Sequence, residues 1–176
     1  MANLTVRTAL VADAAEIARI HVATWQRAYR GQLPDAFLDS MRAEQRRKQW
    51  EMTLSYPAEG TRTFVAELES AVVGFCLVGR CRDDDLGPAV GELLAIYVLP
   101  ECWGQGAGRA LMGAGLAHLS GLGCERAVLW VLASNTRTRA WYQRQGWQLE
   151  GKSKVDRIGV VELKEIRYQR ELAPSE

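Results

Sequence analysis

The stretch that decides the fold is ELLAIYVLPECWGQGAGRAL, residues 92–111. Its pattern predicts an apolar strand, a proline that ends the strand, a glycine-rich turn and the start of a helix. Gly104, Gly106 and Gly108 lack side chains, so the backbone can adopt left-handed dihedral angles and direct several N–H groups at one anion. The helix starting near Gly108 adds free N-terminal N–H groups and a positive dipole end. The stretch therefore predicts a cradle for a pyrophosphate group.

Two common nucleotide-binding motifs do not fit the spacing of these glycines. No Gly-Lys-Ser/Thr follows them, as it does in a P-loop. The three glycines also fail to match the Gly-x-Gly-x-x-Gly of dinucleotide-binding folds. ATP and NAD are therefore disfavoured as ligands.

A second informative stretch is ASNTRTRAWYQRQGW, residues 133–147, which follows the apolar run of residues 127–132. It predicts a polar helix start and a helix that Gly146 closes. The two stretches together resemble the GNAT superfamily of acetyl-CoA-dependent N-acetyltransferases. The signature of that family is Gln/Arg-x-x-Gly-x-Gly/Ala after the fourth strand, and an Asn followed seven residues later by a Tyr after the fifth.

Four residues match that signature and one departs from it. Gly106 and Gly108 fill the glycine positions, and Asn135 and Tyr142 fill the second pair. Trp103 stands where the family has Gln or Arg, which costs a side-chain contact. The cradle uses backbone donors, so we expect it to survive. The resemblance is strong from Glu92 to Trp147 and weaker at both ends.

Length and composition favour one soluble domain over residues 1–176. The formal charge of +1 disfavours a nucleic-acid partner, since such domains usually carry a strong basic excess. No apolar run approaches the ~20 residues that span a bilayer, and the N-terminus lacks a signal core, so the sequence predicts a cytoplasmic protein. Four cysteines without a Cys-x-x-Cys pair and two histidines support no metal site.

The expected elements alternate in the order of the GNAT fold. One strand, two helices, three strands, a helix, a strand, a helix and two strands predict an α/β (α+β) fold. Its central sheet is mixed and mostly antiparallel, of about seven strands, with helices on both faces. Strands are expected over residues 5–8, 63–68, 71–78, 92–98, 127–132, 147–155 and 160–169.

The helices carry recognisable boundary signals. Asp13 with Glu16 three residues later indicates a reciprocal N-cap for a first helix that Gly31 ends. A second helical region opens at Pro34 and continues through residues 42–50. A further helix runs from about Gly108 to residue 121.

The resemblance implies how acetyl-CoA is bound. The fourth and fifth strands splay apart, and the pantetheine arm lies between them along the fourth strand. Asn135 either bonds that arm or acts as a simple helix N-cap, and one residue can do both. The implied cofactor-binding residues are Ile96, Tyr97, Val98, Trp103, Gly104, Gln105, Gly106, Ala107, Gly108, Arg109, Asn135 and Tyr142.

The catalytic residues that the resemblance implies are Glu92 and Tyr142. Glu92 stands 14 residues before Gly106, the separation of the base glutamate in the histone-acetylating branch; the alternative is a solvated strand-end carboxylate. Tyr142 fits a general acid for the coenzyme A thiolate, and its alternative is an aromatic packed on the sheet. A backbone N–H at a strand distortion near Val98 is a candidate oxyanion hole.

The acceptor site is less well defined by the sequence. Trp25, Tyr29 and Tyr97 are candidate walls, although Trp25 equally suits the core. The acidic run of residues 83–85 attracts a cationic amine or is simply solvated. We rank a small amine or amino acid first and a peptide N-terminus or lysine second. A non-catalytic acyl-CoA-binding module, an adenine-nucleotide sensor and a homodimer through the C-terminal strands also remain open.

Overall fold

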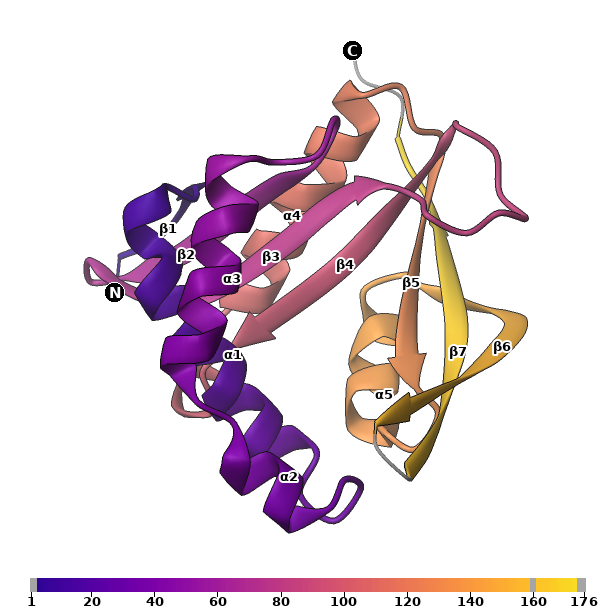
Figure 1. The fold of residues 1–176 in the computed structure, drawn as a ribbon. Coiled ribbons are helices and arrows are strands. Elements are labelled where there is room, and N and C mark those ends of the chain that lie inside the picture. Colours follow the sequence, from indigo (N-terminus) through magenta and orange to yellow (C-terminus); the bar gives the residue numbers. More distant parts are fainter. Residues whose placement is uncertain (1–2, 159–160, 174–176) are drawn as a thin grey trace.

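The computed structural model describes residues 3–158 and 161–173. They form a seven-stranded sheet in the order β1-β2-β3-β4-β5-β7-β6 (Figure 1). Every neighbouring pair is antiparallel except β4 and β5, which confirms the predicted mixed sheet. The strands are β1 Leu4–Thr8, β2 Arg62–Leu68, β3 Ala71–Arg80, β4 Val90–Val98, β5 Arg126–Leu132, β6 Gln148–Ile158 and β7 Val161–Glu171.

Helices cover both faces of the sheet, as predicted (Figure 1). The alternation along β3 shows which helices face which side. The Phe75 ring packs against Trp50 of α3, with ring centres 4.9 Å apart. Its neighbour Cys76 donates through Sγ to the Leu111 carbonyl of α4 at 3.3 Å. The helices are α1 Ala14–Ala28, α2 Asp35–Ser40, α3 Ala43–Ser55, α4 Ala107–Gly121 and α5 Thr136–Arg144, with 3-10 turns at Val11–Asp13 and Pro100–Cys102.

Strands β4 and β5 diverge after a short parallel contact, as the family resemblance implies (Figure 1). Only residues 90–92 of β4 pair with residues 126–128 of β5. Next to this contact β4 carries a bulge, because Leu94 has no partner between the pairs Leu77–Ala95 and Val78–Leu93. A bulge bends and twists its strand. The strand distortion therefore lies at Leu94, and the expectation that it lies near Val98 was wrong.

The start of α1 differs from the predicted reciprocal cap. The Asp13 carboxylate makes no capping bond in the helix. It accepts hydrogen bonds from Arg7 at 2.7 and 2.9 Å and from the Leu10 N–H at 2.7 Å. Glu16 pairs instead with Arg19 at 2.8 Å. The cap prediction was wrong because Arg7 of β1 binds the Asp13 carboxylate.

The predicted helical tract from Pro34 through residue 50 is interrupted. Met41 and Arg42 have extended backbone, with ψ of 132° and 127°. The break separates α2 from α3 and places Met41 in a small apolar cluster with Val22, Leu33 and Leu38. Helix α3 then returns along α1, so that Trp50 reaches the main core.

The β6–β7 hairpin reaches across the diverging strands. The last strand is predicted to start at Val160, which lies outside the described residues, and β7 is described from Val161. Val161 and Leu163 pack on the small cluster around α1 and α2. The C-terminal hairpin therefore contacts the helices of the opposite half of the sheet. Within the described residues, no helix combines the length and apolar character needed to cross a bilayer.

Candidate active site

The glycine turn forms the N-terminus of α4. Gly104 and Gly106 have φ of 81° and 93°, the left-handed region that favours glycine. Gly106 is the N-cap, and the helix ladder begins with the Ala110 N–H donating to the Gly106 carbonyl at 3.0 Å. The N–H groups of residues 107–109 precede that bond and are free to face a ligand. The geometry fits an anion held at the helix start.

Gly108 has a different role from the other two glycines. It lies inside the helix and lacks a positive φ, so the expectation of a left-handed backbone was wrong at this position. A Cβ at Gly108 would lie 3.1 Å from the Trp141 ring. The missing side chain therefore lets α4 approach α5 closely.

Trp103, which departs from the family signature, carries an arginine on its face. The Arg137 guanidinium lies 4.1 Å from the centre of the Trp103 ring, a cation–π geometry. The indole Nε1 donates to the Val98 carbonyl at 2.7 Å, which fixes the ring beside the glycine turn. A cation from the first turn of α5 thus stands near the position where the family has Gln or Arg. Sequence reasoning missed Arg137, although it lies only two residues after Asn135.

The backbone of β4 beyond the bulge faces the space left by β5. The Leu99 N–H donates to the Val73 carbonyl at 2.8 Å, so residues 97 and 99 direct their backbone groups toward β3. By alternation, Ile96 and Val98 direct theirs away from β3, toward the side where β5 has diverged. Among the predicted β4 residues, these two therefore present free backbone positions, apart from the Val98 carbonyl that Trp103 occupies.

Helix α5 positions Asn135 and Tyr142. The Asn135 Oδ1 accepts from the Thr138 N–H at 3.3 Å, so the N-cap alternative is realised. Tyr142 is buried, with its ring 5.2 Å from Trp141 and 6.1 Å from Trp147. Burial, and to a smaller extent the nearby Tyr97 phenol, raises the pKa of Tyr142 well above its usual 10. Its hydroxyl therefore stays protonated at neutral pH.

Three phenols meet where the strands diverge. Burial is the main cause that raises the pKa of Tyr29 and of Tyr97. The Tyr29 hydroxyl interacts with that of Tyr97, and both Tyr97 and Tyr142 raise the pKa of Tyr29 further. The structure thus brings together Tyr97 of β4, Tyr142 of α5 and Tyr29 at the C-cap of α1.

A pocket of about 410 Å³ adjoins Tyr97 on the α1 and α3 side of the sheet. Trp25 and Tyr97, two of the predicted walls, line it. Tyr29 does not line it; its ring stands edge-on behind Trp25 at 5.0 Å. The lining residues are His21, Trp25, Arg46, Gln49, Trp50, Thr53, Leu77, Arg82, Leu94, Ala95 and Tyr97.

Glu92 is buried, and its carboxylate is held by Arg82. The Arg82 Nη2 and Nε donate to the carboxylate at 2.9 and 3.1 Å, and the Arg82 backbone N–H donates at 3.2 Å. The side chain of Glu92 is 3% exposed and that of Arg82 is 70% exposed. Arg82 lines the pocket whereas Glu92 does not. Glu92 can therefore act as a base only after Arg82 has moved away from its carboxylate.

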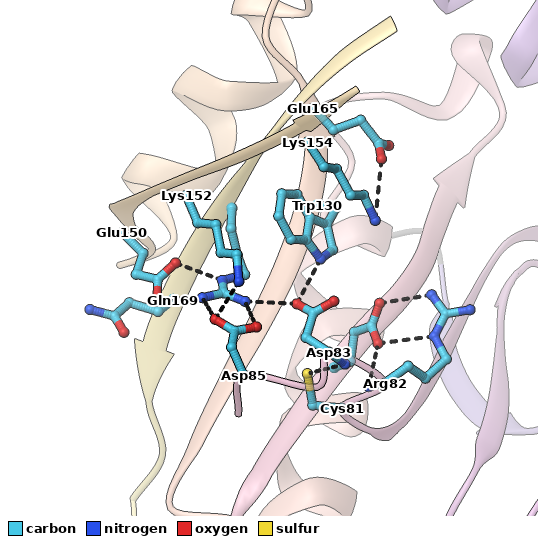
Figure 2. A network of polar contacts seen from close by, with 12 residues as sticks. Cys81, Arg82, Asp83, Asp85, Trp130, Glu150, Lys152, Lys154, Glu165 and Gln169 are labelled. Carbon is cyan, nitrogen blue, oxygen red and sulfur yellow. Dashed lines mark hydrogen bonds and ion pairs between the residues drawn. The ribbon is translucent and has the colours of Figure 1, made fainter. Parts of the chain in front are cut away.

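The acidic loop before β4 is neutralised by a buried arginine. Arg167, on β7, is 1% exposed and bonds Asp83 at 2.9 Å, Asp85 at 2.8 Å and Glu150 at 2.6 Å. Lys152 is a second partner for Asp85, at 2.7 Å (Figure 2). The contacts with Arg167 and Lys152 hold the pKa of Asp85 well below its usual range. Asp83 and Asp85 are thus occupied, and the idea that they attract a cationic amine was wrong for both.

Trp130 of β5 completes the same network. Its Nε1 donates to Asp83 at 2.9 Å, and the Lys154 ammonium lies 4.2 Å from the centre of its ring (Figure 2). Among the described side chains, no group of three or more His, Cys, Asp or Glu is arranged to hold a metal ion.

Comparisons with known proteins find similarity to acetyltransferases. The model of the Acetyltransferase (GNAT) family matches residues 11–147. An uncharacterized N-acetyltransferase of Bacillus subtilis, YuaI, is 34% identical over 164 residues, which cover 93% of this chain and 90% of that protein. The mycothiol acetyltransferase of Streptomyces griseus is 37% identical over 84 residues, but they span only 48% of this chain and 26% of that one. The PaiA N-acetyltransferase of Thermoplasma acidophilum, solved with coenzyme A, has a TM-score of 0.73 at 17% identity and covers 96% of this chain and 99% of its own.

Proposed function

Because the chain belongs to the GNAT family of acetyltransferases, we propose that it transfers an acetyl group from acetyl-CoA to a primary amine within a ternary complex. The observation that carries the proposal is the meeting of three features where β4 and β5 diverge. They are the left-handed N-cap Gly106, the buried phenol of Tyr142 and the pocket beside Tyr97. A small amine or amino acid is the favoured acceptor.

The glycine turn would hold the phosphates of acetyl-CoA. The free N–H groups of residues 107–109 and the positive end of α4 suit a pyrophosphate. Arg109, exposed on the first turn, and Arg137, stacked on Trp103, supply cations on either side. The pantetheine amides would pair with the outward backbone groups of Ile96 and the outward N–H of Val98, as an added strand does.

The reaction requires one proton to leave the acceptor and one to reach the coenzyme A sulfur. The amine lone pair attacks the thioester carbonyl carbon, and the carbon–sulfur bond then breaks. The thiolate, with a thiol pKa near ~8.5 by analogy with cysteine, takes a proton from the Tyr142 hydroxyl. The raised pKa of Tyr142 keeps this donor protonated, although it also makes the phenol a weaker acid than free tyrosine.

An alkyl ammonium of pKa ~10.4 is deprotonated in only about one molecule in a thousand at neutral pH, so a base is required. We assign that role to Glu92, acting directly or through water after Arg82 has moved. We further propose that the enzyme works in the cytoplasm and forms a homodimer through its C-terminal strands.

The proposed activity is tested with a panel of amines and acetyl-CoA, detecting the released thiol. We expect thiol release that depends on both substrates, with acetylated amine found by mass spectrometry in equal amount. Tight binding of acetyl-CoA without thiol release from any amine or peptide would instead indicate a non-catalytic acyl-CoA-binding module.

A Glu92→Gln enzyme should flatten the rise of kcat/KM with pH. Gln retains the size of Glu92 and an acceptor oxygen for Arg82 but cannot take a proton at neutral pH. The rate should fall by about 100-fold for amines of high pKa and less for weakly basic amines. Exposed Glu101 provides the control as Glu101→Gln. Overlapping pH profiles for Glu92→Gln and wild type would leave water or another group as the base.

A further inference from the structure

The pocket beside Tyr97 is lined by two residues whose buried hydrogen-bond donors have no acceptor among the described residues, His21 and Trp25. The tautomer of His21 identifies its Nε2–H as one of these donors. The indole Nε1 of Trp50 can only donate, and it points at the His21 Nδ1 at 3.3 Å. Burial lowers the pKa of His21 to about 4, so the ring is neutral at pH 7 and its proton resides on Nε2. That Nε2 is buried and has no partner within the described structure.

The ring of His21 is held in place by its neighbours. It stacks on Tyr97 at 5.4 Å with an interplanar angle of 20°, and its centre lies 5.5 Å from that of Trp25. The Trp25 Nε1 also lacks a hydrogen bond of normal geometry, although it lies close enough to the Tyr97 hydroxyl to lower the pKa of that phenol. A buried N–H without an acceptor is costly, and an acceptor atom on a bound ligand would remove that cost.

The pocket also contains an arginine whose charge is not compensated. The Arg46 guanidinium bonds the side-chain oxygen of Gln49 at 3.0 Å and pairs with no carboxylate of the described residues. The positive charge of Arg46 acts on groups that line the pocket, because it lowers the pKa of both His21 and Tyr97. The other arginine of the lining, Arg82, is balanced by Glu92.

No aspartate or glutamate lines the pocket. A pocket that selects a polyamine needs carboxylates to balance the second positive charge of the ligand. This pocket has the opposite character, because the Arg46 guanidinium has no carboxylate partner and the His21 Nε2–H has no acceptor among the described residues. Its volume of about 410 Å³ leaves room for a small ligand.

We propose that the acetyl acceptor is a small amine that also carries a carboxylate, and that Arg46 and the His21 Nε2–H bind this carboxylate. The inference rests on the proposed acetyl transfer. With its carboxylate on α1 and α3, such an acceptor extends along Tyr97 and presents its amine toward β4, where that strand separates from β5.

The test compares acceptors that differ only in the anionic group. Amino acids are assayed with acetyl-CoA beside their carboxamides, together with polyamines and a lysine peptide. We expect kcat/KM for an amino acid to exceed that of its carboxamide by about 10-fold or more, because a hydrogen bond to a charged group contributes ~1.5–3 kcal/mol. Arg46→Gln should remove this advantage by raising KM for the acid, with kcat and the carboxamide rates little changed. Lys48→Gln, exposed on the same helix, is the charge-matched control.

The outcomes separate the inference from the function on which it rests. Equal or better use of carboxamides, polyamines or the lysine peptide would overturn the anionic acceptor while leaving the acetyltransferase intact. An acid preference that survives in Arg46→Gln would also overturn it, because the carboxylate would then bind elsewhere. Absence of thiol release with every acceptor would contradict the proposed function itself.

Discussion

A Gly106→Val protein should fold but lose measurable affinity for acetyl-CoA. Gly106 has φ of 93°, where a β-branched side chain is strained by roughly 1–2 kcal/mol. Relief of this strain requires the backbone to rotate, which turns the N–H groups of residues 107–109 away from a common point. Loss of about two charge-assisted hydrogen bonds, at ~1.5–3 kcal/mol each, weakens binding by roughly 100-fold or more. Isothermal titration with acetyl-CoA measures the change.

The matched control is Gly113→Val on the same helix. Gly113 is exposed, has no positive φ, and a Cβ there would meet no atom within 4 Å. This variant should bind acetyl-CoA as wild type does. Unchanged affinity in a folded Gly106→Val protein would show that the phosphates bind elsewhere.

A Tyr142→Phe enzyme should lose kcat by a factor of about 10 to 10⁴, with water replacing the phenol as the proton donor in part. Its affinity for acetyl-CoA should barely change, since Phe retains the ring between Trp141 and Trp147. Because burial raises the pKa of Tyr142, the phenol loses its proton only at a pH above that of free tyrosine. Wild-type kcat should therefore show no alkaline decline from Tyr142 below about pH 10.

Tyr168→Phe separates a catalytic effect from the loss of any buried phenol. Tyr168 is fully buried on β7, and its hydroxyl accepts only long hydrogen bonds, from Arg139 at 3.3 Å and Gln143 at 3.5 Å. The kcat of the Tyr168→Phe enzyme should remain near that of the wild type. Wild-type turnover in purified, folded Tyr142→Phe would remove Tyr142 from the mechanism.

The local parts of the site could be predicted from the sequence because their signals are local. The run from Glu92 to Gly108 contains a strand, its proline stop and a turn that needs left-handed backbone. The strands expected over residues 63–68 and 71–78 leave only Glu69 and Ser70 between them, and both residues have positive φ, as the two-residue turn of the β2–β3 hairpin requires. In such segments the conformational preference and the final structure agree.

The partners of charged side chains could not be predicted in the same way. Arg7 of β1 binds the carboxylate of Asp13 in the 3-10 turn before α1, and Arg82 of the loop after β3 binds that of Glu92 in β4, so each pair forms only when the chain folds back on itself. Nor does any spacing rule bring Arg137 onto Trp103, since the contact depends on how α5 packs beside α4. The chemistry of the site is set by these long-range pairs, which determine whether a carboxylate is free.

The buried Arg167 makes the loop before β4 and the C-terminal hairpin a single exchangeable unit. Arg167 and Trp130 both bind Asp83 in this loop. The residue before Asp83 is Arg82, which lines the pocket and binds Glu92. A loop grafted from a relative without Asp83 and Asp85 would leave the buried Arg167 with Glu150 as its remaining carboxylate partner, and breaking a buried ion pair typically costs ~3–5 kcal/mol. Attempts to alter acceptor choice by exchanging segments must therefore transfer the loop together with β6 and β7, although neither strand lines the pocket.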